Sequence, residues 1–345
     1  MIPIQNIYYM LSYAFQVLNE QGYKNIATEQ FNNTGELMAA ILEKGIAIQL
    51  KRGLGKEYIP QTEALSSLRG KIDIAESIKT QSMLRKQLIC TYDEFSVNSI
   101  MNRIIKSTVE LLLRSNISKQ RKKNLRKLMV YFSEVDFIDL YTVNWNVQYN
   151  RNNQTYRMLI SICYLVVKGL LQTQSNGHTE LMDFLDEQRM CRLYEKFILE
   201  YYRKEFKNQF TANASQIPWQ LDNEENSMLP VMQSDIMLQS GEKVLIIDAK
   251  YYEHSTQVQF DKHTLHSGNL YQIFTYVKNK EYELREKNHT VSGMLLYAKT
   301  DEEIYPNNVY QMSGNQITVR TLDLNLPFDE IAGQLNTIAK TYFDL

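Results

Sequence analysis

The pattern of apolar and polar residues predicts a buried β-hairpin in the second half of the chain. Its first strand covers residues 234–238, its turn is 239–242 (Gln-Ser-Gly-Glu), and its second strand covers 244–250. Residues 244–247 (Val-Leu-Ile-Ile) form an unbroken apolar run, which is typical of a strand that is buried on both faces. The second strand is therefore expected inside a sheet.

Apolar residues spaced by three and four positions predict a series of amphipathic helices in the first half. The first includes Ile7 to Leu18, with Asn6 as its cap. Short strand-like pieces at 57–59 and 71–74 are separated by glycine and proline. Three further helices are expected, and we place them at 37–48, 98–114 and, with many basic residues, 118–131.

A domain boundary is expected near residue 175. Before it, alternation of apolar and polar residues over 143–149 predicts a strand, and 156–171 reads as a buried helix. The polar stretch 173–178 has the composition of a linker. We therefore expect an α+β N-terminal domain at 1–175 and a second domain at 176–345.

The second domain is predicted to be α/β with a mixed sheet. Its order is a long helix, a meander of three strands, a polar loop, a helix and another strand, followed by short elements and a last helix. The long helix is expected at 188–206, the first strand of the meander at 217–219 and the loop at 253–268. The next helix is expected at 269–280, the strand after it at 293–297 and the last helix at 328–342.

Composition and charge exclude some classes of protein. The chain has 345 residues, 44% of them hydrophobic, and a formal net charge of −1. A protein that holds DNA alone and non-specifically normally carries a clear basic excess, so nucleic-acid affinity must be local or supplied by a partner. Three scattered cysteines, no signal-peptide pattern and no apolar run of membrane-spanning length predict a cytoplasmic protein without a membrane partner.

The hairpin carries the candidate chemistry. A four-residue turn would pair Leu238 with Lys243 and place Asp235 opposite Ile246. Because side chains alternate between faces, Asp235, Asp248 and Lys250 then share one face. The two carboxylates become diagonal neighbours about 7–8 Å apart, able to converge on one divalent cation. A surface ion pair is the alternative, but charges at the end of a buried strand are costly unless they are paired or metal-bound.

These residues resemble the PD-(D/E)xK nuclease superfamily, in which an acid on one core strand is followed by acid-x-Lys on the next. Asp235 matches the first position and Asp248-Ala249-Lys250 the second, although Ser234 stands where the motif name has proline. Gln272 and Tyr276 match the Gln-x-x-x-Tyr spacing of RecB-like nucleases and would hold a phosphate or position the lysine. A further acid is expected on the preceding helix, and Glu195 and Glu200 both fit.

Nearly the whole chain is similar to the McrC family, the nuclease subunit of the McrBC modification-dependent restriction system. The similarity rests on four segments in the same order, namely residues 2–14, 68–73, 102–108 and 248–252. It implies a restriction-endonuclease-like domain that hydrolyses DNA phosphodiesters. Asp235, Asp248 and the carbonyl of Ala249 would hold Mg²⁺, and Lys250 would orient the attacking water.

The resemblance also implies a partner that finds the DNA. In this family, a McrB-like AAA+ GTPase hexamer recognises modified cytosine in double-stranded DNA, and the N-terminal domain of McrC docks to it and stimulates its GTPase. GTP would bind to the partner, since this chain contains no G-x-x-x-x-G-K-[ST] phosphate loop.

Two other functions fit parts of the sequence. The chain could be a catalytically silent regulator of an AAA+ ring, although the site motif is intact, or a stand-alone DNA repair nuclease, for which a basic channel is missing. The basic run 119–127 fits a solvated helix face or an acidic partner better than it fits DNA. His254, His263 and His266 lack a fourth ligand and the ordered spacing of a zinc site.

Overall fold

The structure is a computed structural model of two compact units. It describes residues 2–15, 18, 23, 26, 29, 31, 33–150, 153, 155–173, 187–222, 228–252, 257–259, 262–299 and 305–345. Unit 1 comprises Met1–Phe31 and Asp183–Leu345, and unit 2 comprises Asn32–Met182. The division expected at residue 175 is thus close to the observed one, but the first 31 residues belong to the C-terminal unit. The expected linker at 173–178 lies largely outside the described residues.

Aromatic packing explains why the N-terminal segment joins unit 1. Helix α1 (Ile4–Ala14) packs against helix α8 (Glu187–Glu205). The ring of Tyr13 lies against those of Phe197, Tyr201 and Phe328, and its hydroxyl donates to Glu205. Asn6 is not the helix cap. It is buried, and its amide donates to the carbonyls of Leu324 and Leu326.

Unit 1 is built around a six-stranded mixed sheet, which confirms the expected mixed α/β architecture. The strand order is β12-β13-β11-β8-β7-β4. Strands β8, β11 and β13 run parallel, whereas the other neighbouring pairs are antiparallel. The strands are β4 (Thr211–Asn213), β7 (Ile236–Ser240), β8 (Lys243–Lys250), β11 (Thr290–Ala298), β12 (Asn308–Met312) and β13 (Asn315–Leu322).

The first strand of the meander is not the one expected at 217–219. Strand β4 takes that edge position, while β5 (Gln216–Ile217) pairs with β6 (Met232–Gln233) in a separate two-stranded sheet. Trp219 lies beyond β5, and its indole N–H donates to the carbonyl of Pro230. The expected polar loop contains a small antiparallel pair, β9 (Gln257–Gln259) and β10 (Lys262–Thr264), with residues 253–256 and 260–261 outside the described part.

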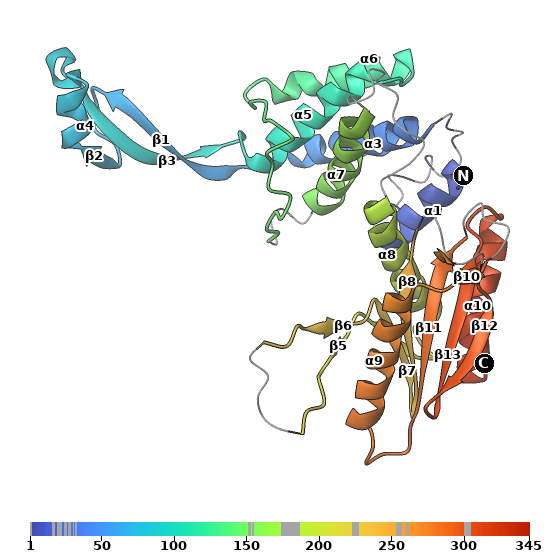
Figure 1. The fold of residues 1–345 in the computed structure, drawn as a ribbon. Helices are drawn as coiled ribbons and strands as arrows, with labels where there is room; N and C mark the ends of the chain where they lie inside the picture. Colours follow the sequence, from blue (N-terminus) through green and yellow to red (C-terminus); the bar gives the residue numbers. More distant parts are fainter. Residues whose placement is uncertain are drawn as a thin grey trace. The chain divides into compact units, whose positions relative to one another are not determined.

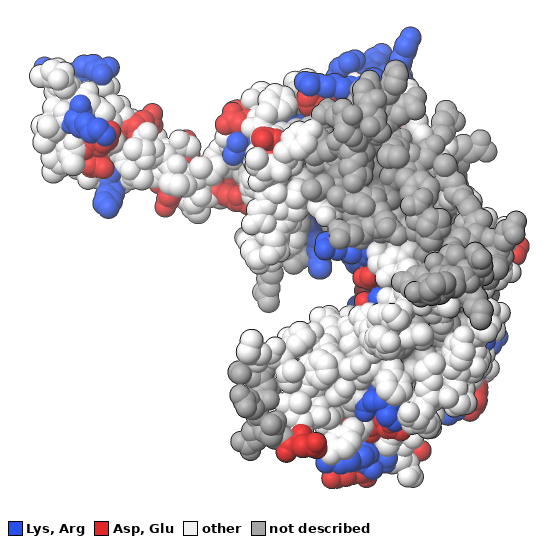
Figure 2. All heavy atoms as spheres, viewed as in Figure 1, with Lys and Arg blue, Asp and Glu red and all other residues white. Residues whose placement is uncertain are grey.

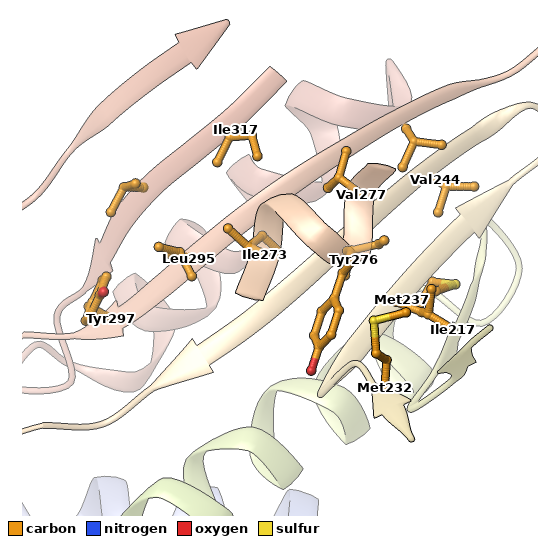
Figure 3. Packing of buried hydrophobic residues seen from close by; sticks show 13 residues of the cluster. Ile217, Met232, Met237, Val244, Ile273, Tyr276, Val277, Leu295, Tyr297 and Ile317 are labelled. Carbon is orange, nitrogen blue, oxygen red and sulfur yellow. The ribbon is translucent and has the colours of Figure 1, made fainter. Parts of the chain in front are cut away.

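Helix α9 (Ser267–Glu283) covers one face of this sheet and α10 (Phe328–Phe343) covers the other. Figure 3 shows Ile273 and Val277 of α9 packed against Leu295 and Ile317 of the sheet. The helix passes close to β11 because position 293 is glycine. An added Cβ there would lie 2.8 Å from the Val277 side chain. On the opposite face, Thr318 of β13 is hydrogen-bonded to Tyr342 of α10.

Unit 2 combines a group of helices with an arm, as Figure 1 shows. The arm is an antiparallel sheet in the order β1-β3-β2, extended by two short helices. Its elements are β1 (Glu57–Leu65), β2 (Lys71–Asp73), α4 (Ile74–Lys79), η3 (Ser82–Arg85) and β3 (Leu88–Ser96). The helices are α3 (Thr34–Arg52), α5 (Ile100–Arg114), α6 (Lys119–Met129), η4 (Val130–Phe132) and α7 (Tyr156–Thr173).

The prediction of a strand at 143–149 is wrong. The segment has no strand pairing among the described residues, although the side chains at 143, 145, 147 and 149 are half-buried and those between them are exposed. The ring of Trp145 lies against Tyr164 of α7. Alternation therefore reported correctly which side chains face the protein, but it carries no information on whether the backbone has a hydrogen-bonded neighbour.

Among the described residues, no helix combines the length and the apolar character needed to cross a bilayer.

Candidate active site

The hairpin that positions the site has a tighter turn than expected. Ser240 pairs with Lys243, so only Gly241 and Glu242 form the turn, and the register differs by two residues from the expected one. Gly241 has φ +56°, a conformation that glycine adopts without strain and that two-residue hairpin turns require. The expected pairing of Leu238 with Lys243 is therefore wrong.

A shift of two residues leaves every side chain on its expected face. Extending the observed register by one residue places Asp235 directly opposite Asp248 instead of diagonal to it. Directly opposed residues lie about 4.5–5.5 Å apart, nearer than the diagonal distance expected from the sequence. Asp235, Asp248 and Lys250 thus converge at the end of β8, on the sheet face that α9 covers.

Asp248 is buried, with 1% of its surface exposed, whereas Asp235 is half-buried. Asp248 Oδ2 lies 2.8 Å from Lys250 Nζ and forms an ion pair with it. Asp235 Oδ2 accepts the backbone N–H of Ala249 at 2.9 Å. Two carboxylates beside a single ammonium group leave an excess of negative charge, which favours a further cation at this position.

Burial also shifts the protonation of the site. It raises the pKa of Asp248 to about 7; Lys250 opposes this rise, and the carboxylate of Asp235 adds to it. Burial raises the pKa of Asp235 as well. Burial alone would lower the pKa of Lys250, but the Asp248 and Asp235 carboxylates raise it above its ordinary value. The lysine therefore stays positively charged, and the Asp235 carboxylate disfavours ionisation of Asp248 beside it.

The structure distinguishes the two candidates for the further acid that was expected on α8. Glu195 is half-buried, and its pKa is raised by burial and by the nearby Asp235 carboxylate. Glu200 instead forms an ion pair with Arg203, at 2.7 Å. Glu195 is therefore the acid that lies near the hairpin carboxylates. Cys191 was not predicted as a site residue, yet its thiol donates to Glu195 Oε1 at 3.1 Å. Its position one helical turn before Glu195 is the signal that could have identified it.

Gln272 and Tyr276 of α9 form a chain of hydrogen bonds with the lysine. Lys250 Nζ donates to Gln272 Oε1 at 3.2 Å, and Gln272 Nε2 donates to the Tyr276 hydroxyl at 2.9 Å. Of the two roles expected for this pair, the contacts correspond to positioning the lysine.

No group of three or more His, Cys, Asp or Glu side chains that could hold a metal occurs within the part of the chain that the structure describes. The ring of His266 lies against Tyr252, while His254 and the side chain of His263 are outside the described part. A site for Mg²⁺ needs fewer side chains, because this ion usually keeps several waters and binds through one or two carboxylates. Asp235 and Asp248 satisfy that requirement.

Comparison with known proteins gives one family and several relatives. A profile of the McrBC 5-methylcytosine restriction system component family matches residues 5–298. The chain is 29% identical over 348 aligned residues to the type IV methyl-directed restriction enzyme EcoKMcrBC of Escherichia coli K12, covering 99% of this chain and 98% of that protein.

Two solved structures show a weaker likeness. A half-complex from a tetradecameric assembly of Thermococcus gammatolerans McrB AAA+ hexamers with bound McrC has a TM-score of 0.48 at 19% identity, covering 97% of this chain and 76% of that chain. The cryo-EM structure of the T. gammatolerans McrBC complex has a TM-score of 0.42 at 22% identity, covering 59% of each chain.

Proposed function

Because the chain belongs to the McrBC 5-methylcytosine restriction system component family, we propose that it is the endonuclease subunit of a GTP-dependent restriction complex that cuts DNA at modified cytosine. Unit 1 is then a PD-(D/E)xK nuclease domain. The observation that carries the proposal is the convergence of Asp235, Asp248 and Lys250 at the end of β8, where the Lys250 ammonium group lies 2.8 Å from the buried Asp248 carboxylate. The match to a methyl-directed restriction enzyme over nearly the whole chain supports it.

The proposed cofactor is Mg²⁺, held by Asp235, Asp248 and the carbonyl of Ala249. The residues fit this ion because the two carboxylates and the carbonyl offer oxygen ligands, which Mg²⁺ prefers. When bound, magnesium lowers the pKa of a coordinated water and neutralises charge on the phosphate.

Lys250 supplies a fixed positive charge to the reaction. Asp248 and Gln272 hold its ammonium group from two sides, and Tyr276 holds Gln272 in turn. A cation that is positioned before the reaction stabilises negative charge on the scissile phosphate without first having to reorganise. Its N–H groups also orient the attacking water.

Metal binding can be measured without cleavage. We expect Mg²⁺ to raise the melting temperature of the wild-type chain and to have little effect on Asp248→Asn, which loses a carboxylate ligand. At a hundredfold excess over its Kd, a ligand stabilises by about 2.7 kcal/mol, or roughly 5–10 °C for a unit of this size. Asp344→Asn, a change at an exposed carboxylate of the same unit, serves as the control. Equal shifts in both variants would rule out this metal site.

We propose that unit 2 docks to the partner, a McrB-like AAA+ GTPase hexamer, through its arm. The arm exposes many large apolar side chains, which in a soluble protein mark an interaction surface. They lie on the three strands, the two short helices and the segment between β1 and β2, and comprise Tyr58, Leu68, Ile72, Ile74, Ile78, Met83, Leu84 and Phe95. GTP and the modified base would be bound by the partner, and the complex would act in the cytoplasm.

A buried network anchors the arm to the helices of unit 2. The amide of Asn102 on α5 donates to the carbonyls of Gly55 and Val97, which flank β1 and β3. Its carbonyl oxygen accepts from the Tyr156 hydroxyl, which in turn accepts from the backbone N–H of Gly55. Glycine suits position 55, since a Cβ there would lie 3.0 Å from the Tyr156 ring, a contact to which the ring would have to yield.

Asn102→Ala should therefore loosen the arm and leave the nuclease unit intact. The change removes the hydrogen-bond donor of two backbone carbonyls and the acceptor of the Tyr156 hydroxyl. We therefore expect a loss of about 1–3 kcal/mol in the free energy of unfolding of unit 2. Stimulation of the partner's GTPase should fall in parallel. Denaturant unfolding and a GTPase assay test this, with Asn144→Ala at an exposed site as the control. Unchanged stability and stimulation would contradict the anchoring role.

The proposed function is tested by omitting one component at a time. Plasmid DNA with and without methylated cytosine is incubated with the chain, the partner ring, GTP and Mg²⁺. We expect cleavage only of methylated DNA and only when all four are present. Cutting by the chain and Mg²⁺ alone would instead identify a stand-alone nuclease.

A further inference from the structure

Helix α6 is held in a fixed rotation against α3. Arg121 on its inner side forms ion pairs with Glu36 at 3.4 Å and Glu43 at 2.9 Å. Asn124 donates to Glu43, and Leu125 is fully buried. Ser118 caps the helix by accepting the N–H of Arg121. These contacts determine which side of α6 faces outward.

The outward side carries a stripe of four cations, Lys119, Lys123, Arg126 and Lys127. They follow the i, i+4, i+7, i+8 spacing of one helix face and are all exposed. None of the four has a hydrogen bond or an ion pair with another described residue. Figure 2 shows Lys and Arg gathered over α6 at the top of the view. In a chain with a net charge of −1, this is a pronounced local excess.

We propose that this basic stripe binds the phosphate backbone of duplex DNA. Lys119 and Lys127 lie eight residues apart, about 12 Å along a helix. Duplex DNA carries about one charge per 1.7 Å, or roughly seven charges over that length. Four cations on a rigid face can therefore each meet a phosphate.

The composition of the exposed face favours DNA over an acidic protein surface, which reverses the preference inferred from the sequence alone for the run 119–127. Protein interfaces bury apolar and aromatic residues at their centre and are depleted in lysine. The exposed face of α6 has lysine, arginine and glutamine, and its half-buried Leu128 lies toward the protein. The apolar arm described above has the opposite character. The two surfaces of unit 2 thus differ in the partner that they suit.

This inference deepens the proposed function, on which it rests, by naming where the substrate is held outside the nuclease unit. It is tested by binding alone, in EDTA and without the partner, so that it can fail while the cleavage proposal stands. The probe is a short fluorescent duplex without modified cytosine, titrated with the full-length chain at several KCl concentrations.

The test variant replaces Lys119, Lys123, Arg126 and Lys127 by glutamine. Each phosphate contact contributes about −0.9 to the slope of log K against log salt, so we expect the slope to become shallower by about 3–4. A second variant, Lys119→Arg with Lys123→Arg and Lys127→Arg, keeps the charge and should keep the slope. Circular dichroism and melting curves verify that each variant is folded.

A matched control replaces four other exposed cations of unit 2, namely Lys51, Arg52, Arg85 and Lys86, by glutamine. Its slope should stay close to that of the wild type. An unchanged slope in the stripe variant, an equal change in the control, or no measurable DNA binding by the wild-type chain would overturn the proposal. Loss of affinity for the partner ring with DNA binding intact would do so too, and would assign the stripe to a protein surface.

Discussion

Lys250→Ala should abolish DNA cleavage by the assembled complex. The ammonium group is the only cation that contacts Asp248 among the described residues, and it is held in place by Gln272. Removing one preorganised charge of this kind costs about 10²–10³ in rate. Asp248→Asn should be at least as severe, because it also removes a metal ligand. Cleavage is measured on methylated plasmid with the partner, GTP and Mg²⁺ present.

The control for this prediction is Lys243→Ala. Lys243 lies at the other end of β8 and pairs with the exposed Asp344, so its loss should leave cleavage unchanged. Melting curves show whether each variant is folded. Cleavage at the wild-type rate by Lys250→Ala or Asp248→Asn would show that the hairpin is not the active site.

A charge at the tip of the arm should uncouple the chain from its partner. Ile78 and Leu84 are 62% and 81% exposed, and burying an aspartate at either position in an interface would leave its charge unpaired. Loss of an interface hot spot costs about 2 kcal/mol or more, which is roughly thirtyfold in affinity. We therefore expect the double variant Ile78→Asp, Leu84→Asp to lose stimulation of the partner's GTPase and partner-dependent cleavage together.

The matched control is Val309→Asp on the edge strand β12 of unit 1, which exposes a comparable apolar side chain. It should retain both activities. If the arm variant binds the ring and stimulates GTP hydrolysis like the wild type, docking occurs through another surface of the chain.

The hairpin shows which features of the site can be predicted from the sequence pattern. The apolar run in β8 and the period of two predicted which residues share a face, and an error of two residues in the register left that prediction intact. The register itself depends on the φ value that Gly241 adopts. A Gln-Ser-Gly-Glu stretch fits a four-residue and a two-residue turn equally well, so the pairing of Asp235 could not be predicted.

In the arm and the N-terminal helix, some features of the fold could not be predicted from the sequence pattern. Strand β3 was not predicted because most of its side chains remain partly or fully exposed on both faces, so no alternation marks it. Helix α1 was predicted from its periodicity, but its partner α8 lies far away in sequence. The aromatic contacts of Tyr13 that join them carry no local signal.

Within the site, the motif identified the three residues on the hairpin, and the Gln-x-x-x-Tyr spacing identified Gln272 and Tyr276 but left two roles open for them. The contact of Lys250 with Gln272 depends on where α9 crosses the sheet, which the close approach at Gly293 determines. Glu195 and Glu200 are indistinguishable by periodicity alone. The ion pair of Glu200 with Arg203 separates them only in three dimensions.

We propose that this chain cuts the DNA and that its partner recognises the modified site. Cleavage and GTP hydrolysis are therefore measured in the same reaction, with the wild-type chain and with Asp248→Asn. We predict that the variant stimulates the partner's GTPase as the wild type does but leaves methylated DNA uncut. Cleavage by the Asp248→Asn complex at the wild-type rate would contradict the account, because the cutting site would then lie elsewhere.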